Sequence, residues 1–285
     1  SKKSNYQFGA RKEGCFGMAE IGKYFYQNKN NNSDQVLSDR ICNDLDFDEF
    51  YMFVDRCVSS TGQQYLYNHL RGTTAHIPVN ESEEGIINQL SDNATFRTRT
   101  IKTLSKLKSP KAYYLVDLFF GDHIRKPSWF LLIKLLFIAS ILSFLFIFIN
   151  STFILVSIFL VLINSGIHYW NKRNLQVYLD SIPQLMKMYE VAMELNKIIE
   201  LKGKFGITGQ SIALLRTLRN KVLVFKLESK IDSDLMSIAW GLVELVKIAF
   251  LIEPVLLFNA IEQVKDRAKD IERVFVFIGH TDLLL

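Results

Sequence analysis

Cysteine is scarce in this chain of 285 residues, and its three cysteines form no recognised motif. Cys15, Cys42 and Cys57 are odd in number and contain no CxxC pair, so the sequence indicates neither a disulfide framework nor a zinc site. The simplest interpretation is a reducing compartment. The N-terminus also lacks a basic segment followed by an apolar run and a small-residue cleavage site, so no secretory signal is predicted.

The sequence also lacks the motifs on which an enzyme could be built. Its histidines form no HExxH and no pair at the spacing of metal ligands, and no serine lies in a GxSxG elbow. The stretch GKFGITGQS, residues 203 to 211, is out of register with a P-loop, because Gln210 stands where the lysine should be. We interpret it as a turn that closes a helix. No catalytic residue, cofactor-binding residue or metal ligand is predicted in this chain.

Three aspartates at alternate positions in NDLDFDEF, residues 43 to 50, fit the first ligand positions of a calcium loop. Such a loop needs Gly at its sixth position, where Glu49 stands, and Glu at its twelfth, where Asp55 stands. The acids therefore favour the start of a helix, where they complement the helix dipole. The apolar residues expected to face a core from this helix are Leu45, Phe47, Phe50 and Val54.

A mild basic excess, with a formal net charge of +5, suits either a membrane surface or nucleic acid and identifies neither. The densest basic run is KTLSKLKSPK, residues 102 to 111, which could contact DNA phosphates. No nucleic-acid reading module accompanies it. A helix end beside an anionic membrane explains the same lysines, and their nearness in sequence to Trp129 favours this alternative. The candidate DNA-binding lysines are Lys102, Lys106, Lys108 and Lys111.

Two long apolar runs, residues 129 to 149 and 152 to 170, are nearly free of charge. At ~1.5 Å per residue, each is long enough to cross a hydrocarbon core of roughly 30 Å. The one charge is Lys134, close enough to the start of the first run for its stem to snorkel to the interface. The two-residue joint between the runs predicts a transmembrane helical hairpin. Its predicted boundaries are Trp129, Ile149, Thr152 and Trp170.

The flanks of the predicted hairpin are basic, with Arg125 and Lys126 before it and Lys172 and Arg173 after it. By the positive-inside rule, both long flanks are expected on the cytoplasmic side. The alternative is a buried hairpin in a soluble helical protein. That alternative requires the other segments to cover every face of both helices, and these segments are too amphipathic to do so.

The remaining sequence is predicted to be helical, apart from a polar linker over residues 27 to 34. Thr61 and Gln64 form a candidate capping box. The apolar stretch 236 to 261 contains charged residues, which are costly at mid-bilayer, and is predicted to form two soluble core helices, with a third membrane span as the alternative. The amphipathic helices are expected between residues 37 and 107, over 174 to 202, and over 260 to 278.

The stretch VLSDRICNDLDFDEFYMFVDRCVSSTGQQYLYNHLRGT, residues 36 to 73, resembles as a whole the start of the MutS core domain. The resemblance lies in its opening, in Asp55 and Arg56, in the turn with Gly62, and in the aromatic and leucine residues that follow. It is similar in particular to the membrane-anchored MutS-related proteins of Bacteroidetes-type bacteria, which carry a transmembrane hairpin in this region. FIGHTDLLL, residues 277 to 285, is similar to the lever segment that leads to the ATPase domain of that family.

This resemblance implies a mainly α fold, a MutS core and lever interrupted by a transmembrane hairpin. Neither the mismatch-reading domain nor the ATPase domain has a counterpart, so the chain is expected to be the N-terminal part of a longer protein. The predicted divisions are an N-terminal segment and linker (1–35), the first part of the core (36–128), the hairpin (129–170), and the second part of the core with the lever helices (171–285).

The function implied by the resemblance is to transmit nucleotide-driven movement to DNA or to a protein partner, at the bacterial inner membrane. ATP and magnesium are expected only for the full-length protein, whose missing ATPase domain would also form a homodimer. The expected partners of this chain are membrane lipid, DNA and an unidentified protein. An alternative from another class is a membrane-tethered helical scaffold with no DNA role. A small membrane enzyme ranks last, because no nucleophile, base or metal cluster is visible.

Overall fold

The computed structural model describes residues 17–28, 35–73, 81–120, 129–198, 201–202 and 236–285. These residues are mostly helical, which confirms the mainly α prediction. Among them, β1 (Gln35–Val36) pairs antiparallel with β2 (Gly72–Thr73) in a two-stranded sheet. The P-loop-like stretch 203 to 211 and most of the polar linker lie outside the described residues.

The helices before the predicted hairpin are short. They are α1 (Met18–Ile21), α2 (Lys23–Gln27), α3 (Asp39–Asp44), α4 (Phe47–Val54), α5 (Ser60–Arg71), α6 (Glu81–Asp92), α7 (Ala94–Leu104), the 3-10 helices η1 (Ser105–Leu107) and η2 (Pro110–Leu115), and α8 (Val116–Phe119). The later helices are α9 (Phe130–Phe146), α10 (Phe153–Leu195), α12 (Met236–Ala249), α13 (Ile252–Lys265) and α14 (Ala268–Leu283).

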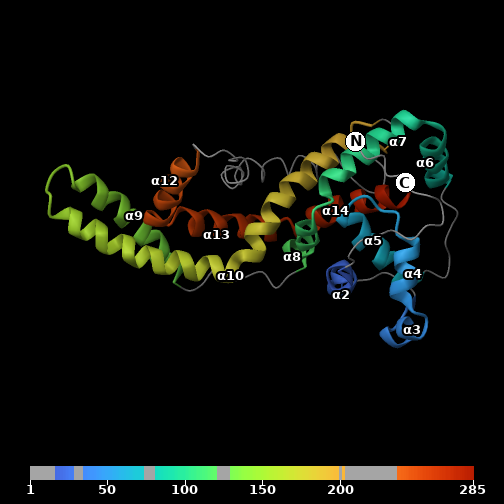
Figure 1. The fold of residues 1–285 in the computed structure, drawn as a ribbon, viewed down its shortest axis with the longest axis horizontal. Helices are drawn as coiled ribbons and strands as arrows, with labels where there is room; N and C mark the ends of the chain where they lie inside the picture. Colours follow the sequence, from blue (N-terminus) through green and yellow to red (C-terminus); the bar gives the residue numbers. More distant parts are fainter. Residues whose placement is uncertain (1–16, 29–34, 74–80, 121–128, 199–200, 203–235) are drawn as a thin grey trace.

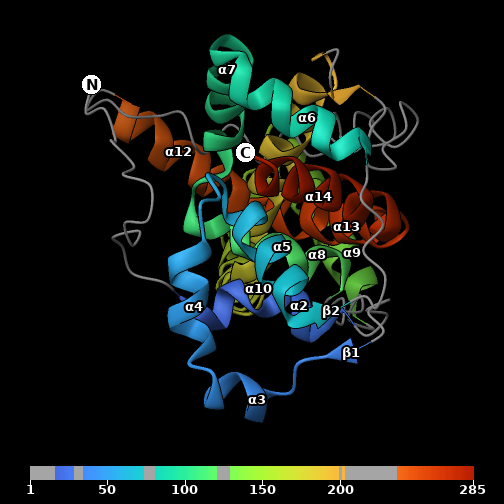
Figure 2. The same ribbon diagram turned by 90° about the vertical axis from the view of Figure 1, so that its right-hand side faces the viewer.

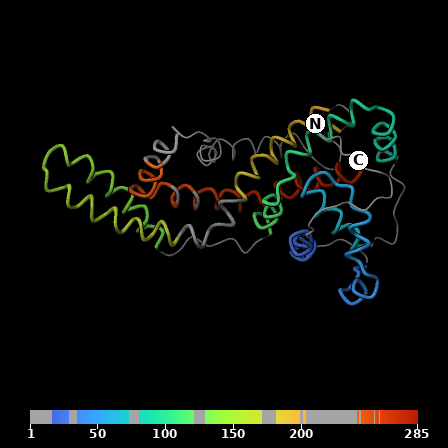
Figure 3. The backbone as a smooth tube through the Cα atoms, viewed as in Figure 1, coloured from blue at the N-terminus to red at the C-terminus, as the bar shows by residue number. Residues whose placement is uncertain are grey.

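The described elements form an elongated molecule, in which α9 and the first part of α10 project at one end (Figure 1, Figure 3). Towards the other end, α10 contacts α7, η1, η2, α8 and α14, while α3 and α4 lie farther from it (Figure 1). The helix α13 leads from the projecting pair back towards this body. The chain therefore consists of a helical body and an apolar extension that share one helix.

The shared helix, α10, is 43 residues long and continues through Pro183. The amphipathic helix predicted over residues 174 to 202 is thus the second part of α10, and it ends at Leu195. The members of its apolar stripe whose side chains are described are buried in the main core, as their helical spacing predicts. The buried members of that stripe are Ile182, Leu185, Met188, Val191, Leu195 and, just past the helix, Ile198.

The acidic stretch 43 to 50 spans the junction of α3 and α4. Asp46 has the left-handed backbone conformation, with φ of 47°, which separates the two helices. The helix α4 buries Phe47 and Tyr51, but Leu45 and Phe50 are 63% and 50% exposed. The prediction that these apolar residues share one core face is therefore wrong for Leu45 and Phe50. The break at Asp46 separates Leu45 from α4.

The start of α5 also differs from the prediction. Its N-cap is Ser59, whose Oγ accepts a hydrogen bond from the Gly62 amide at 2.9 Å. The capping box predicted from Thr61 and Gln64 is therefore wrong, because the N-cap lies two residues earlier. The Gln64 side chain is fully buried instead and donates hydrogen bonds to main-chain carbonyls of neighbouring segments.

The described C-terminal part of the chain, residues 236 to 285, forms the three helices expected, but their bounds differ from the prediction. The apolar stretch 236 to 261 does form two helices, α12 and α13, as predicted. The single helix predicted over residues 260 to 278 is wrong, because the backbone leaves helical geometry at Arg267 and separates α13 from α14. The helix α14 then lies beside α5 (Figure 2), and Gly279 allows the close approach, since a Cβ there would meet Tyr65.

Candidate membrane anchor and its link to the C-terminal helix

The helix α9 and the first part of α10 are antiparallel neighbours joined by residues 147 to 152 (Figure 1). Within the described residues, one helical segment is long and apolar enough to cross a membrane by length and composition, Phe153–Trp170. The helix α9 is a shorter apolar helix of 17 residues. It begins beside the predicted boundary Trp129 and ends at Phe146, before the predicted boundary Ile149.

Most of the apolar surface of this helix pair is uncovered. Only 11% of the Phe153–Trp170 segment is buried. A contiguous exposed surface of this kind marks a protein or membrane contact in natural proteins. A buried hairpin in a soluble protein, the alternative, requires other segments to cover every face of both helices. The described residues cover little of this surface. The large apolar side chains that are at least half exposed are Leu131, Leu132, Leu135, Ile138, Phe144, Leu145, Phe148, Ile149, Leu155, Ile158, Phe159 and Leu162.

The polar side chains of the pair point inward, between the two helices. The hydroxyl oxygens of Ser143 and Ser157 lie 2.7 Å apart, and Asn164 Nδ2 donates to Ser140 Oγ at 2.9 Å. Ser140, Ser143 and Asn164 are buried. A water-soluble helix pair has the opposite arrangement, with an apolar seam and polar outer faces. Small and polar residues between helices are instead the packing that hydrocarbon favours.

Sequence reasoning missed this polar seam, although a signal for it exists. Ser140 and Ser143 recur at helical spacing within an otherwise apolar run, as do Ser157 and Asn164 in the next run. Spacing of this kind places each pair on one helix face. The two faces then meet when the hairpin closes.

The base of the helix pair carries two tryptophans. The rings of Trp129 and Trp170, two of the predicted boundaries, lie against each other with centroids 5.0 Å apart. The exposed Lys134 directs its Nζ over the ring of Phe130, 5.1 Å from the centroid, and thus towards the base. These contacts match an aromatic belt and a snorkelling lysine. Of the other boundaries, Thr152 immediately precedes α10.

The helix α12 attaches to the hairpin through polar contacts. Asn164 Nδ2 also donates to the carbonyl oxygen of Ala249 at 2.6 Å. Nearer the base, His168 Nε2 lies 3.8 Å from a carboxylate oxygen of Glu244, which also pairs with Lys247 at 3.3 Å. His168 is buried. The described hairpin is therefore fastened to the C-terminal helices at two levels along α10.

The four candidate DNA-binding lysines are exposed. Lys106 pairs with Glu194 of α10 at 2.5 Å. Glu194 lies about 36 Å along α10 from Trp170, at ~1.5 Å per residue. That separation exceeds the ~10 Å Debye length several times over, so nearness to Trp129 in sequence no longer favours a membrane role for these lysines. Lys102 lies in α7, Lys108 follows η1, and Lys111 lies in η2.

A second candidate site links α14, near the C-terminal end, to the start of α5. Asp282, near the end of α14, is buried against the N-terminus of α5. Its Oδ1 accepts from the Val58 amide at 2.9 Å, and its Oδ2 accepts from the amide and hydroxyl of Ser59 at 2.8 and 2.6 Å. The first N–H groups of a helix and its dipole favour a carboxylate at this position. One side chain thus fastens α14 to α5.

The ionisation of Asp282 reflects two opposed effects. Burial raises the pKa of Asp282 to about 6, while the hydrogen bonds from Ser59 and Val58 favour the carboxylate and oppose this shift. Sequence reasoning did not identify Asp282 as a functional residue. The available signal was one acid within the apolar terminal run.

Comparison of this chain with known protein families, with curated proteins and with solved structures gives no match.

Proposed function

We propose that this protein is a membrane-anchored helical protein whose anchor is the hairpin of α9 and α10. The observation that carries the proposal is the inverted pattern of the hairpin, with Ser143, Ser157 and Asn164 inside and large apolar side chains outside. In water this arrangement exposes apolar surface at a large free-energy cost. In hydrocarbon it pairs the serine hydroxyls and the Asn164 amide nitrogen inside the hairpin and leaves the apolar surface in contact with lipid.

We further propose that the helical body is the core and lever portion of a MutS-like ATPase. Two parts of the chain carry the resemblance, residues 36 to 73 and residues 277 to 285. Support comes from their contact, because Asp282 in the second part accepts hydrogen bonds from Val58 and Ser59 in the first. Two segments that transmit one movement are expected to contact each other. These two do so through the buried carboxylate of Asp282.

In this proposal, α14 receives nucleotide-driven movement and α10 conveys it towards the membrane. The second part of α10 and α14 share the main core, where Met188 and Phe275 are among the fully buried members. Since α10 continues without interruption from that core into the hairpin, a shift of α14 would tilt the body against the anchor. ATP and magnesium would act in the ATPase domain of the complete protein, at the cytoplasmic face of the inner membrane.

The test is an ATPase assay on carbonate-washed membranes from cells expressing the product of the complete gene, with membranes from cells lacking the gene as the control. Activity that stays in the washed pellet and rises with duplex DNA, more strongly at low salt, is the expected result. Activity without any DNA response would favour a protein partner. Protein in the pellet without ATPase activity would contradict the MutS-like assignment and favour a tethered scaffold.

A further inference from the structure

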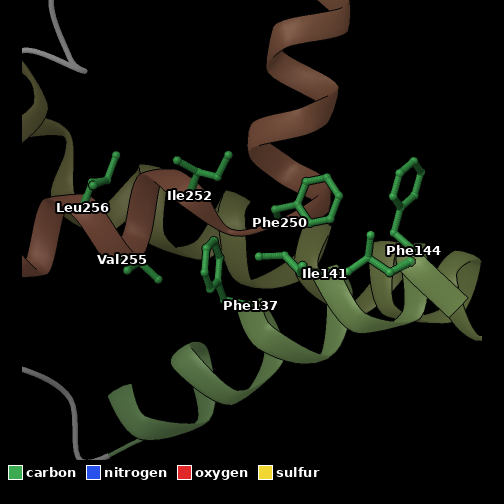
Figure 4. Close-up of a pocket in the computed structure, with 8 residues that line it drawn as sticks. Phe137, Ile141, Phe144, Phe250, Ile252, Val255 and Leu256 are labelled. Carbon is green, nitrogen blue, oxygen red and sulfur yellow. The ribbon is translucent and has the colours of Figure 1, made fainter.

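An apolar crevice lies between α9 and the corner at which α12 meets α13 (Figure 4). Its volume is about 350 Å³, within the range of small ligand sites. Its walls are apolar side chains from both sides, and none of the described residues that line it is polar or charged. Residues that represent the two walls are Phe137, Ile141 and Phe144 on α9, and Phe250, Ile252 and Val255 at the corner.

The depth of the crevice follows from its position along α9. Its lining residues on α9 run from Phe137 to Leu145. At ~1.5 Å per residue, they lie about 12 to 24 Å along the helix from Trp129. If Trp129 marks the interface, this wall lies in the central part of a hydrocarbon core roughly 30 Å thick. The corner that faces it must then lie inside the bilayer as well.

Along α12, charged residues give way to apolar ones towards the corner, as a position of the corner inside the bilayer requires. Glu244 and Lys247 lie in the second half of α12, where Glu244 faces His168, two residues before Trp170 along α10. The sequence is then apolar from Ile248 to Ile252, with Leu251 fully buried, and Glu253 follows. Glu244 and Lys247 therefore lie near the base of the hairpin, and an apolar turn of five residues separates them from Glu253.

Main-chain polar groups at the corner form hydrogen bonds within the protein, as they must in hydrocarbon. The carbonyl of Ala249, in the last turn of α12, accepts from the buried Asn164 at 2.6 Å. The amides of Phe250 and Leu251 donate to carbonyls of α12 at 3.1 and 3.3 Å. A helix break is tolerated at membrane depth when neighbouring groups meet its polar atoms in this way.

We propose that the crevice binds an acyl chain of a membrane lipid, and that the α12 to α13 corner lies inside the bilayer as a re-entrant element. This inference rests on the proposed anchor. The crevice is continuous with the exposed apolar surface of the hairpin, which already faces lipid in that proposal. Water needs two to four polar partners, and a peptide needs hydrogen bonds for its main chain. The crevice walls offer neither, whereas an acyl chain needs only apolar contact.

The experiment measures tryptophan fluorescence in vesicles of phosphatidylglycerol and phosphatidylcholine that carry bromine at mid-chain or close to the headgroup. In a background in which Trp129, Trp170 and Trp240 are phenylalanine, a single tryptophan replaces Phe250. We expect mid-chain bromine to quench most of its emission and headgroup-proximal bromine to quench little. Phe148→Trp at the hairpin tip reports the anchor, and Phe53→Trp on the body should escape quenching, because Phe53 lies far from the hairpin.

A second pair of variants tests occupancy of the crevice. Val255→Phe adds a ring to the crevice and should lower mid-chain quenching of the tryptophan at position 250. Leu155→Phe, on the lipid-facing side of α10 where Leu155 is 71% exposed, is the matched control and should leave the quenching unchanged. If Phe250→Trp fails to fold, Val246→Trp, at an exposed position near the corner, carries the same expectation.

The outcomes separate this inference from the proposed anchor. Quenching at position 148 with none at position 250 would overturn the inference and leave the anchor standing. The same holds for quenching at position 250 that Val255→Phe does not reduce, because the crevice would then hold no acyl chain. No quenching at either position would overturn both proposals.

Discussion

Arginine at both Ile138 and Leu162 is expected to remove the protein from carbonate-washed membranes. These side chains lie near the middle of the two apolar runs and are 50% and 67% exposed, so arginine at either position would face lipid. Arginine at the centre of a membrane helix costs about 2.5 to 3.5 kcal/mol on insertion scales. Two such residues on one hairpin together cost about 5 to 7 kcal/mol, which is enough to prevent stable insertion.

The control for this pair is Phe53→Arg, which adds arginine at a similarly exposed apolar position on the body, where the side chain is 53% exposed. That variant should stay in the washed pellet, because its arginine remains in water. Immunoblots of the pellet and the wash measure both. Complete retention of the double variant in the pellet would count against lipid contact by the hairpin.

Replacement of Asp282 with alanine is expected to lower the stability of the body by about 2 to 4 kcal/mol at neutral pH, because it leaves three hydrogen-bond donors before α5 without their acceptor. The donors are the amides of Val58 and Ser59 and the Ser59 hydroxyl. Thermal unfolding followed by circular dichroism in detergent measures the loss. Asp92→Ala, at an exposed acid in the last turn of α6, is the control and should change little.

The pH dependence of this loss has a definite sign. Because burial raises the pKa of Asp282 from 3.8 to about 6, the folded state binds more protons than the unfolded state between these values. The contribution of Asp282 to stability is thus fully present below about pH 4 and declines as the pH rises through 6. The deficit of Asp282→Ala should therefore grow as the pH is lowered from neutral towards 4. Parallel stability curves for the two proteins would contradict this account.

The sequence predicted the parts of the fold that depend on local periodicity. The stripe from Ile182 to Leu195 has helical spacing throughout, so its burial followed from the pattern alone. The uncharged runs likewise indicated an apolar helix pair. In both cases the pattern of residues within one segment predicts the structure. No contact with a distant segment has to be known.

The missed features depend on contacts between distant segments. Asp282 accepts from residues more than two hundred positions earlier in the chain, and Asn164 contacts both α9 and α12. Neither partner can be inferred from local spacing. The break at Arg267 and the left-handed turn at Asp46 lack the glycine or proline that usually marks such a site, which explains why periodicity was extended across them.

The most direct test of the membrane anchor is the accessibility of its tip. In a variant whose native cysteines are serine, Asn150→Cys places one thiol at the exposed tip, and Leu45→Cys places one on the body, where Leu45 is also exposed. Both are treated with a membrane-impermeant maleimide in intact spheroplasts and again after lysis. The account predicts that Asn150→Cys is labelled in intact spheroplasts and Leu45→Cys only after lysis. Labelling of Asn150→Cys only after lysis would contradict a hairpin that crosses the membrane.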